Sequence, residues 1–372
     1  MKSYKIIKIF LSSILIIFVF LLFDLLINII LPENLKKKIG TTRNYSLKST
    51  NFHHEIAPNI NLYEHWGSKK YKVVTNKFGM RVLNKNKRMI NNSKKNIGFI
   101  GDSFVYGSGI NYKKHFINIL DEKNNDYNLL NFGYVSYSPS IYYKKLKHLI
   151  EVENLKLNKV FIFVDHSDVQ DEGIFYREDE KGNIVRKWYN DEKVNSKNKK
   201  YKIKNYLKQN SFIYKFYEHF NSPKISKKTS KCISNIYEKN YINYIDSNRF
   251  GYGYKEKISK EKWVKEGINK ILIYLDKILQ LSKKYNFEIH IVFYPSAMEI
   301  LEDIHFSSSK HFIFLNEWAL KNKINFINTY NQFNKNNVAK NNYLENFIKC
   351  DVHWNDLGHS KISKSLSDFI NN

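Results

Sequence analysis

Short, almost wholly apolar runs alternate with longer amphipathic stretches along the chain after residue 95. The apolar runs fall at residues 96–100, 127–131, 159–164, 288–293 and 324–327, and helical patterns at residues 140–152, 262–285, 309–321 and 355–370. Uninterrupted apolar runs are typical of parallel strands that are covered on both faces. Strands that alternate with helices predict an α/β fold. We therefore expect a three-layer α/β/α sandwich around a central parallel sheet of about five strands.

The first 31 residues have a different pattern. Residues 9–23 carry no charge, and the apolar run continues to residue 31 with only Asp24 and Asn28 interrupting it. This length suffices for a helix across a hydrocarbon core of about 30 Å. Three lysines within residues 1–8 favour a cytoplasmic N-terminus. We expect a single-pass anchor in the inner membrane, with the rest of the chain in the periplasm. An alternative is a signal peptide that is removed, which also exports the chain.

The remaining chain divides into two parts by composition. Residues 32–95 are polar and irregular, and we interpret them as a stalk that leads into the main domain. Residues 96–372 carry the alternating pattern, which is interrupted by an insertion at residues 171–261. The insertion contains a predicted hairpin around residues 181–183 and an aromatic-rich amphipathic stretch at residues 206–220. It is either a lid or acceptor-binding region over the active face, or a structural flap with no substrate role.

Composition changes this picture only slightly. The net charge of +26 comes from 61 Lys and Arg against 35 Asp and Glu. The basic residues are scattered, and Lys, Asn, Ile, Tyr and Phe are abundant together, as in products of AT-rich genomes. We therefore expect no nucleic-acid partner, although a basic surface favours anionic glycans or lipid headgroups. Cys232 and Cys350 lack metal-ligand spacing, and both a disulfide and two free thiols remain open.

Three blocks of residues that carry chemistry follow predicted strands or precede the last helix. They are Gly101-Asp102-Ser103, Asn131-Phe132-Gly133 and Asp351-Val352-His353-Trp354-Asn355. A serine hydroxyl becomes a good nucleophile when a histidine takes its proton and a carboxylate fixes that histidine. Taken singly, each block has a plain alternative: a turn, a strand-end glycine, or a helix N-terminal charge beside a surface histidine.

Taken together, the blocks resemble the SGNH/GDSL hydrolase family over roughly residues 76–370. The motif Asn76-x-x-Gly79-x-Arg81 is similar to one found in membrane-anchored or secreted members, and it predicts a turn at Gly79. The form Asp-x-His-Trp-Asn resembles a subset that includes polysaccharide O-acetyltransferases. The resemblance implies that Ser103 is the nucleophile, His353 the general base and acid, and Asp351 the residue that orients His353. It implies neither metal nor cofactor.

The same resemblance implies an oxyanion hole with three arms. The N–H groups of Ser103 and Gly133 supply two arms, and an Asn side chain normally supplies the third. Here Ser167 stands at that position, and the neighbouring His166 is an alternative donor. Loss of one such donor costs a factor on the order of 10²–10³ in rate. We also expect Asp102 and Tyr294 to take part in substrate binding.

The sequence therefore predicts a serine-dependent acyl-ester hydrolase or O-acyltransferase. Its expected substrate is an acylated carbohydrate or lipid of the cell envelope, and a membrane protein that donates acyl groups is a candidate partner. The rival hypothesis is a catalytically weak module of the same fold that binds glycan or scaffolds a membrane complex. Ser167 in place of Asn supports that rival, whereas the complete Ser, His and Asp set opposes it.

Overall fold

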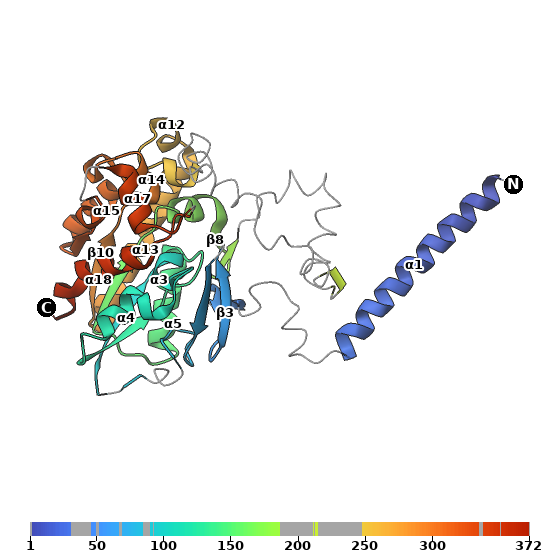
Figure 1. The fold of residues 1–372 in the computed structure, drawn as a ribbon, viewed down its shortest axis with the longest axis horizontal. Coiled ribbons are helices and arrows are strands. Elements are labelled where there is room, and N and C mark those ends of the chain that lie inside the picture. Colours follow the sequence, from blue (N-terminus) through green and yellow to red (C-terminus); the bar gives the residue numbers. More distant parts are fainter. Residues whose placement is uncertain are drawn as a thin grey trace. The chain divides into compact units, whose positions relative to one another are not determined.

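The structure is a computed structural model that describes most of the chain as two compact units (Figure 1). One unit is Met1–Asn44 with Asn190–Lys224, and the other is Tyr45–Tyr189 with Ile225–Asn372. The described residues are 2–30, 46–49, 52–66, 69–84, 90–91, 93–186, 211, 213–214, 248–334, 338–349 and 351–371. Cys232, Cys350 and nearly all of the predicted amphipathic stretch at residues 206–220 lie outside them.

In the first unit, residues Lys2–Ile30 form helix α1. Asp24, which interrupts the apolar run, is buried, and its Oδ1 accepts a hydrogen bond from the Ile213 N–H at 2.9 Å. Among the residues that the structure describes, no helix combines the length and apolar character needed to cross a membrane. The anchor predicted for residues 9–31 is therefore not confirmed.

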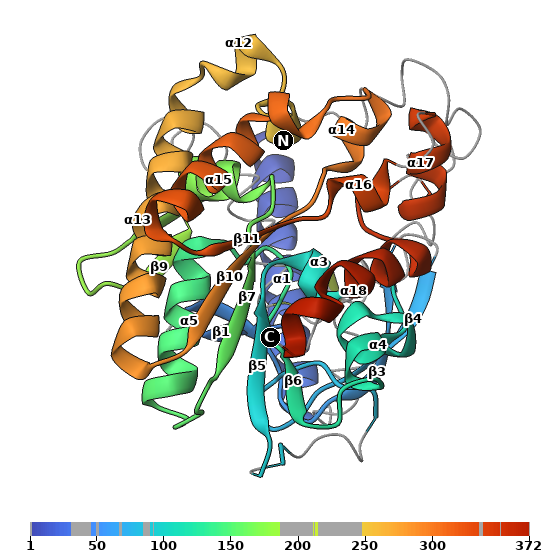
Figure 2. The same ribbon diagram turned by 90° about the vertical axis from the view of Figure 1, so that its left-hand side faces the viewer.

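The second unit is built on a five-stranded sheet in the order β11-β10-β7-β5-β6, with every neighbouring pair parallel (Figure 2). Its strands are β5 (Lys95–Ile100), β6 (Tyr127–Asn131), β7 (Lys159–Phe163), β10 (Glu288–Phe293) and β11 (Asn325–Asn328). All five predicted strands are present within one residue of their expected bounds. This confirms the predicted α/β class, and the sheet is the one that the SGNH/GDSL resemblance implies.

Helices cover both faces of the sheet, which makes the predicted three layers. On one face lie α5 (Pro139–Glu151), α13 (Lys262–Tyr285) and α15 (Lys310–Asn322). On the other lie α3 (Ser103–Tyr106), α4 (Phe116–Asp121), α14 (Ala297–Leu301), α16 (Tyr330–Phe333), α17 (Ala339–Asn346) and α18 (Asp356–Asn371). Short helical turns are η2 (Tyr112–Lys114), α6 (Asp168–Gln170), η3 (Asp171–Phe175), α11 (Asn248–Gly251), α12 (Glu256–Ser259) and η4 (Phe306–Ser308).

The central strands alternate between these two cores because successive side chains of a strand point to opposite faces. Ile100 and Ile162 pack in the core under α5 and α13. Phe99 and Phe161 point to the other core, where their rings stack with centroids 5.1 Å apart. Both faces are therefore apolar, which is why these strands have no polar alternation in the sequence.

The segment that we expected to be an irregular stalk contains two antiparallel strand pairs. They are β1 (Ser46–Ser49) with β2 (His53–Ile56), and β3 (Asn61–Trp66) with β4 (Lys69–Val74). On β3 and β4, Glu64, Tyr71 and Val73 are buried while Tyr63 and Lys70 are exposed. One face of this hairpin is therefore part of the folded unit. Its few apolar residues concealed it in the sequence.

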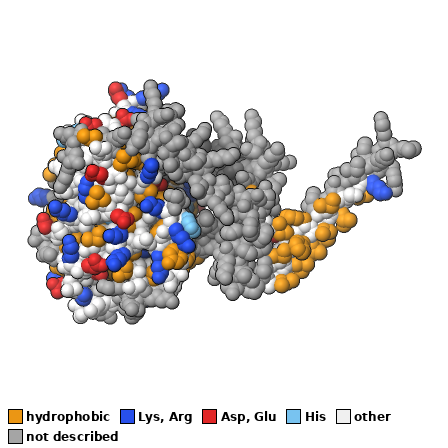
Figure 3. Space-filling view, in the orientation of Figure 1, with side chains coloured by type: hydrophobic (Ala, Val, Ile, Leu, Met, Phe, Trp, Pro, Cys, Tyr) orange, Lys and Arg blue, Asp and Glu red, His pale blue; other side chains and the backbone are white. Residues whose placement is uncertain are grey.

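The segment that we interpret as an insertion lies between β7 and β10. The predicted hairpin is present as β8 (Tyr176–Glu178) paired with β9 (Ile184–Arg186). The turn of this hairpin contains Gly182, whose φ of +76° lies in the left-handed region. Glycine adopts this conformation without the steric cost that other residues have. On the face of the second unit shown in Figure 3, basic and acidic side chains are interspersed, which agrees with the scattered lysines of the sequence.

We predict that Phe161→Ala lowers the free energy of unfolding by about 3–5 kcal/mol, because it removes a fully buried ring from the centre of the sheet. Urea denaturation followed by circular dichroism measures this change. Val152→Ala is the control, since Val152 is 62% exposed and should cost less than about 0.5 kcal/mol. Equal losses in the two variants would contradict the assigned core.

Candidate active site

The proposed nucleophile, Ser103, is the first residue of α3, directly after β5. Asp102 caps this short helix, because its Oδ1 accepts a hydrogen bond from the Phe104 N–H at 2.9 Å. Gly101 permits the tight turn: a Cβ at this position would lie 2.4 Å from Val105 Cγ2. The strand end, the glycine and the cap together fix Ser103 at the carboxyl edge of the sheet.

His353 and Asp351 lie in the loop between α17 and α18, and the structure brings both to Ser103. His353 Nε2 is 2.7 Å from Ser103 Oγ. His353 Nδ1 is hydrogen-bonded to Asp351 Oδ1, which also accepts the His353 backbone N–H at 2.9 Å. An ionised carboxylate can only accept, so Nδ1 carries the proton and Nε2 is free to accept from the serine hydroxyl. This is the geometry of an activated serine.

The Asp-x-His-Trp-Asn motif also determines the shape of its own loop. The Trp354 side chain is fully buried, and an isolated bridge pairs Trp354 with Phe347. Asn355 Oδ1 accepts the N–H groups of Leu357 and Gly358 at 2.9 and 3.0 Å, and so caps α18. The Tyr343 hydroxyl donates to the Asp351 carbonyl at 3.0 Å. The loop is therefore held on both sides of the Asp-x-His pair.

The interaction between these two side chains lowers the pKa of Asp351 and raises the pKa of His353. Burial opposes ionisation of Asp351, but the positive charge and hydrogen bonds of His353 outweigh it and lower the pKa of Asp351. Burial likewise opposes the imidazolium form of His353, but the Asp351 carboxylate outweighs it and raises the pKa of His353 above its ordinary value. The raised pKa makes His353 a stronger base toward Ser103.

Arg81 explains the motif Asn76-x-x-Gly79-x-Arg81. Asn76 Oδ1 accepts the N–H groups of Phe78 and Met80, both at 3.0 Å, and Gly79 takes the left-handed conformation with φ +72°. The turn predicted at Gly79 is thereby confirmed, and it directs Arg81 into the interior, where it is 2% exposed.

The Arg81 guanidinium group binds the loop that follows α3. Its Nη1 donates to the carbonyls of Tyr106 and Gly107 at 2.8 and 2.6 Å. Its Nη2 donates to the carbonyl of Ile110 and, at 3.1 Å, to that of Lys72 on β4. A buried cation that satisfies four carbonyls fixes the end of the nucleophile helix. Sequence reasoning found Arg81 but not this role.

The β3–β4 hairpin supplies a contact that sequence reasoning missed entirely. Trp66 Nε1 donates to Asp351 Oδ2 at 2.9 Å, and the Trp66 ring packs edge-on against the His353 ring with centroids 4.8 Å apart. The Phe104 ring lies against the His353 ring, also at 4.8 Å. A tryptophan in a polar stretch gives no periodic signal, so only the tertiary structure could place it.

The residues predicted to form the oxyanion hole make hydrogen bonds or ion pairs with other groups of the protein. The Gly133 N–H donates to Asn131 Oδ1 at 3.0 Å, so an oxyanion role requires this amide to be shared or released. Ser167 is buried, and its N–H donates to Asp165 Oδ1 at 2.7 Å. His166, the alternative donor, instead has its Nε2 2.9 Å from Glu299 Oε2, where both side chains are buried.

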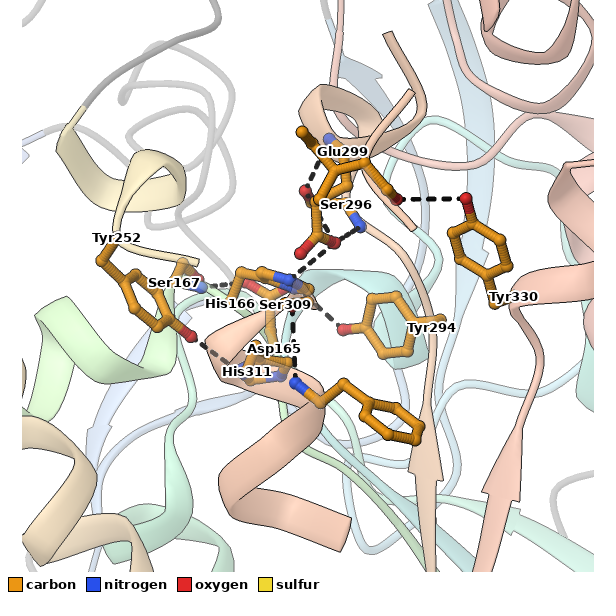
Figure 4. Close-up of polar contacts among 12 residues, drawn as sticks. Asp165, His166, Ser167, Tyr252, Tyr294, Ser296, Glu299, Ser309, His311 and Tyr330 are labelled. Carbon is orange, nitrogen blue, oxygen red and sulfur yellow. Dashed lines mark hydrogen bonds and ion pairs between the residues drawn. The ribbon is translucent and has the colours of Figure 1, made fainter. Parts of the chain in front are cut away.

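Figure 4 shows that Asp165, His166 and Ser167 lie among polar contacts that also involve Tyr294 and Glu299. The Tyr294 hydroxyl donates to Asp165 Oδ2 at 3.0 Å, and Tyr294 is 1% exposed. The structure thus places Tyr294, which we expected to line the cleft, in the interior beside Asp165. The carboxylate of Asp102 is similarly buried, and its Oδ2 lies 3.1 Å from Ser103 Oγ, where it competes with the nearer His353 Nε2 for the one hydroxyl proton. Within the described part of the chain, no group of His, Cys, Asp and Glu is arranged to hold a metal ion.

Comparison with known proteins finds similarity only among solved structures. Neither a protein-family model nor a curated protein matches the sequence. A member of the lipolytic protein G-D-S-L family from Veillonella parvula is 10% identical with a TM-score of 0.41, over 75% of this chain and 99% of that one. An acetyl xylan esterase is 12% identical with a TM-score of 0.41, over 74% and 99%. A structure described as TesA is 7% identical with a TM-score of 0.40, over 74% and 98%. Sequence identities and TM-scores this low do not assign a function, so we infer the chemistry from the residues of this chain.

The raised pKa of His353 predicts the pH dependence of any serine chemistry at this site. His353 must be neutral to accept the serine proton, so the rate falls as the pH drops through its pKa. The acid limb of kcat/KM should therefore lie above the ordinary histidine value of about 6.5. In Asp351→Asn, burial acts on His353 without the opposing carboxylate charge, so the limb should move to lower pH. The rate should fall by a factor on the order of 10³–10⁴.

The measurement is the rate of p-nitrophenyl acetate hydrolysis between pH 5 and pH 9, with phosphonate labelling of Ser103 as a second readout. Asp276→Asn is a matched control, because Asp276 accepts the Trp318 indole N–H between α13 and α15. An acid limb that Asp351→Asn leaves in place would show that another group titrates.

Proposed function

We propose that this protein is a serine-dependent acyl-ester hydrolase or O-acyltransferase that works through an acyl-serine intermediate. The observation that carries the proposal is the pair of hydrogen bonds at His353, one to Ser103 Oγ at 2.7 Å and one to Asp351. Residues 103 and 353 are 250 positions apart in the chain. The arrangement has the three parts that serine acyl transfer needs: a nucleophile, a base and a group that orients the base.

The chemistry follows from this geometry. Ser103 Oγ attacks the acyl carbonyl while His353 Nε2 takes its proton, and the Asp351 carboxylate stabilises the imidazolium that forms. His353 then gives the proton to the leaving alcohol, which leaves the acyl group on Ser103. A water molecule or a sugar hydroxyl next attacks the acyl-serine, with His353 again as the base. Hydrolysis and transfer share every step except the identity of this second acceptor.

The proposed substrate is an acylated carbohydrate of the cell envelope. Support comes from the Asp351-x-His353-Trp354-Asn355 motif, which resembles the subset with polysaccharide O-acetyltransferases, and from the net charge of +26, which favours anionic glycans. An acylated lipid is a second candidate, and a membrane protein that supplies acyl groups is the proposed partner if the reaction is transfer.

The central experiment tests the nucleophile. Full-length wild type, Ser103→Ala and His353→Ala are treated with a serine-directed phosphonate and with p-nitrophenyl acetate, and peptide mapping locates the label. We expect a label on Ser103 in wild type, none in Ser103→Ala, and labelling slowed on the order of 10³-fold or more in His353→Ala, because the hydroxyl then lacks its base.

A folded wild type that neither accepts the label nor turns over the ester would contradict the proposal. The rival hypothesis of a catalytically weak binding module would then be favoured. Ser167→Ala extends the same assay to the oxyanion hole: if the Ser167 hydroxyl is the third donor, kcat falls on the order of 10²-fold. Unchanged kcat in this variant would assign the third donor elsewhere.

The proposed location is the inner membrane, with the catalytic unit in the periplasm. The support is the sequence of residues 1–31, in which lysines precede a long apolar run. Fusion of alkaline phosphatase to the C-terminus should give an active reporter, because that enzyme folds only outside the reducing cytoplasm. An inactive fusion, together with an active cytoplasmic reporter at the same position, would contradict this location.

A further inference from the structure

The β3–β4 hairpin contacts both the loop that carries His353 and the helix that carries Ser103. On one side, Trp66 Nε1 donates to Asp351 Oδ2 at 2.9 Å. On the other side, Glu64 Oε2 accepts the Tyr106 hydroxyl at 3.0 Å, and Tyr106 is the last residue of the nucleophile helix α3. Glu64 also accepts the Tyr71 hydroxyl from β4. The hairpin thus spans from the helix of Ser103 to the loop of His353.

The two oxygens of Asp351 have different partners. Oδ1 accepts both the backbone N–H and Nδ1 of His353. Among the contacts of the described residues, the donor to Oδ2 is the Trp66 indole. With Oδ2 held, rotation of the carboxylate about its Cβ–Cγ bond is restrained, which favours the orientation in which Oδ1 faces His353 Nδ1. The Trp66 ring also packs edge-on against His353, which limits rotation of the imidazole.

We propose that Trp66 is a positioning residue for the Asp351–His353 pair, so that residues 61–74 belong to the catalytic apparatus. The inference rests on the proposed function, since it assigns how the base of that reaction is aligned with Ser103. It also gives the N-terminal segment a role beyond a connection to the sheet. Trp66 does not touch the reacting atoms: it acts through Asp351.

The alternative is that Trp66 only fills space. The indole packs beside Gly109, where a Cβ would lie 3.4 Å from Trp66 Cδ1, and Gly109 has φ +80°. A space-filling role needs the ring but not the N–H. Trp66→Phe separates the two, because it keeps an aromatic ring and removes the donor to Asp351, whereas Trp66→Ala removes both.

Trp318→Phe is a matched control. Trp318 Nε1 donates to Asp276 Oδ1 at 2.8 Å, a bond of the same chemistry between α15 and α13. Any general effect of removing an indole-to-carboxylate bond from this fold appears in both variants. An effect on catalysis should appear only at Trp66.

The experiment measures kcat and KM for p-nitrophenyl acetate across pH, in the full-length wild type and the three variants. For Trp66→Phe we expect kcat lower by about 10-fold with KM within about 2-fold, the effect of losing one hydrogen bond to a charged group. The acid limb should move to higher pH, because a carboxylate that has lost a donor binds the imidazolium proton more strongly. Proton NMR should show a shift of the low-field His353 Nδ1–H resonance.

Three outcomes would overturn the inference: wild-type kcat and pH profile in Trp66→Phe, a loss confined to Trp66→Ala, or an equal loss in Trp318→Phe. Phosphonate labelling of wild-type Ser103 keeps this test apart from the proposed function. If wild-type Ser103 is labelled and Trp66→Phe is unaffected, only the role of Trp66 fails. If wild-type Ser103 is not labelled, the serine chemistry itself fails.

Discussion

All five strands of the central sheet run in the same direction, so the loops that follow them leave from one edge. This constraint places Ser103 after β5, Gly133 after β6 and Ser167 after β7 on the same edge of the sheet. His353 comes from a loop outside the sheet and reaches the same edge because Trp354 is buried among the aromatic side chains beneath α18. The site therefore depends on the parallel topology, which lets residues far apart in the sequence lie at the same edge of the sheet.

Holding a nucleophile at the start of a four-residue helix poses a physical difficulty, since so short a helix has few internal hydrogen bonds. The chain solves it from both ends of α3. Asp102 caps the first turn, and Arg81 binds the carbonyls at and beyond the last one. Burying a guanidinium is costly unless its donors are satisfied, and here four carbonyls accept from its two terminal nitrogens, Nη1 and Nη2. The residues before the sheet thus stabilise the part of the sheet edge where the chemistry is expected.

Behind the site, the interior is unusually polar for a core. Burial and the nearby carboxylates of Asp102 and Asp165 raise the pKa of Asp168 well above its ordinary value. Its Oδ2 accepts the Tyr142 hydroxyl and the Asp165 N–H, both at 2.9 Å. Paired groups of this kind give a rigid interior with fixed dipoles. They hold the loop with Ser167, at the position where the family resemblance expects an Asn, in one conformation.

The sequence by itself predicted the five strands, the four longest helices around them and the candidate residues Ser103, His353 and Asp351, because these depend on local signals. Apolar runs marked the strands, and Gly-Asp-Ser and Asp-x-His-Trp-Asn marked the ends of elements where the candidate catalytic side chains lie. Tertiary structure alone decided the rest. It placed Tyr294 in the interior beside Asp165, buried Arg81 against four carbonyls and brought Trp66 to Asp351. These contacts join residues up to 285 positions apart, and no local pattern specifies which buried donor meets which distant acceptor.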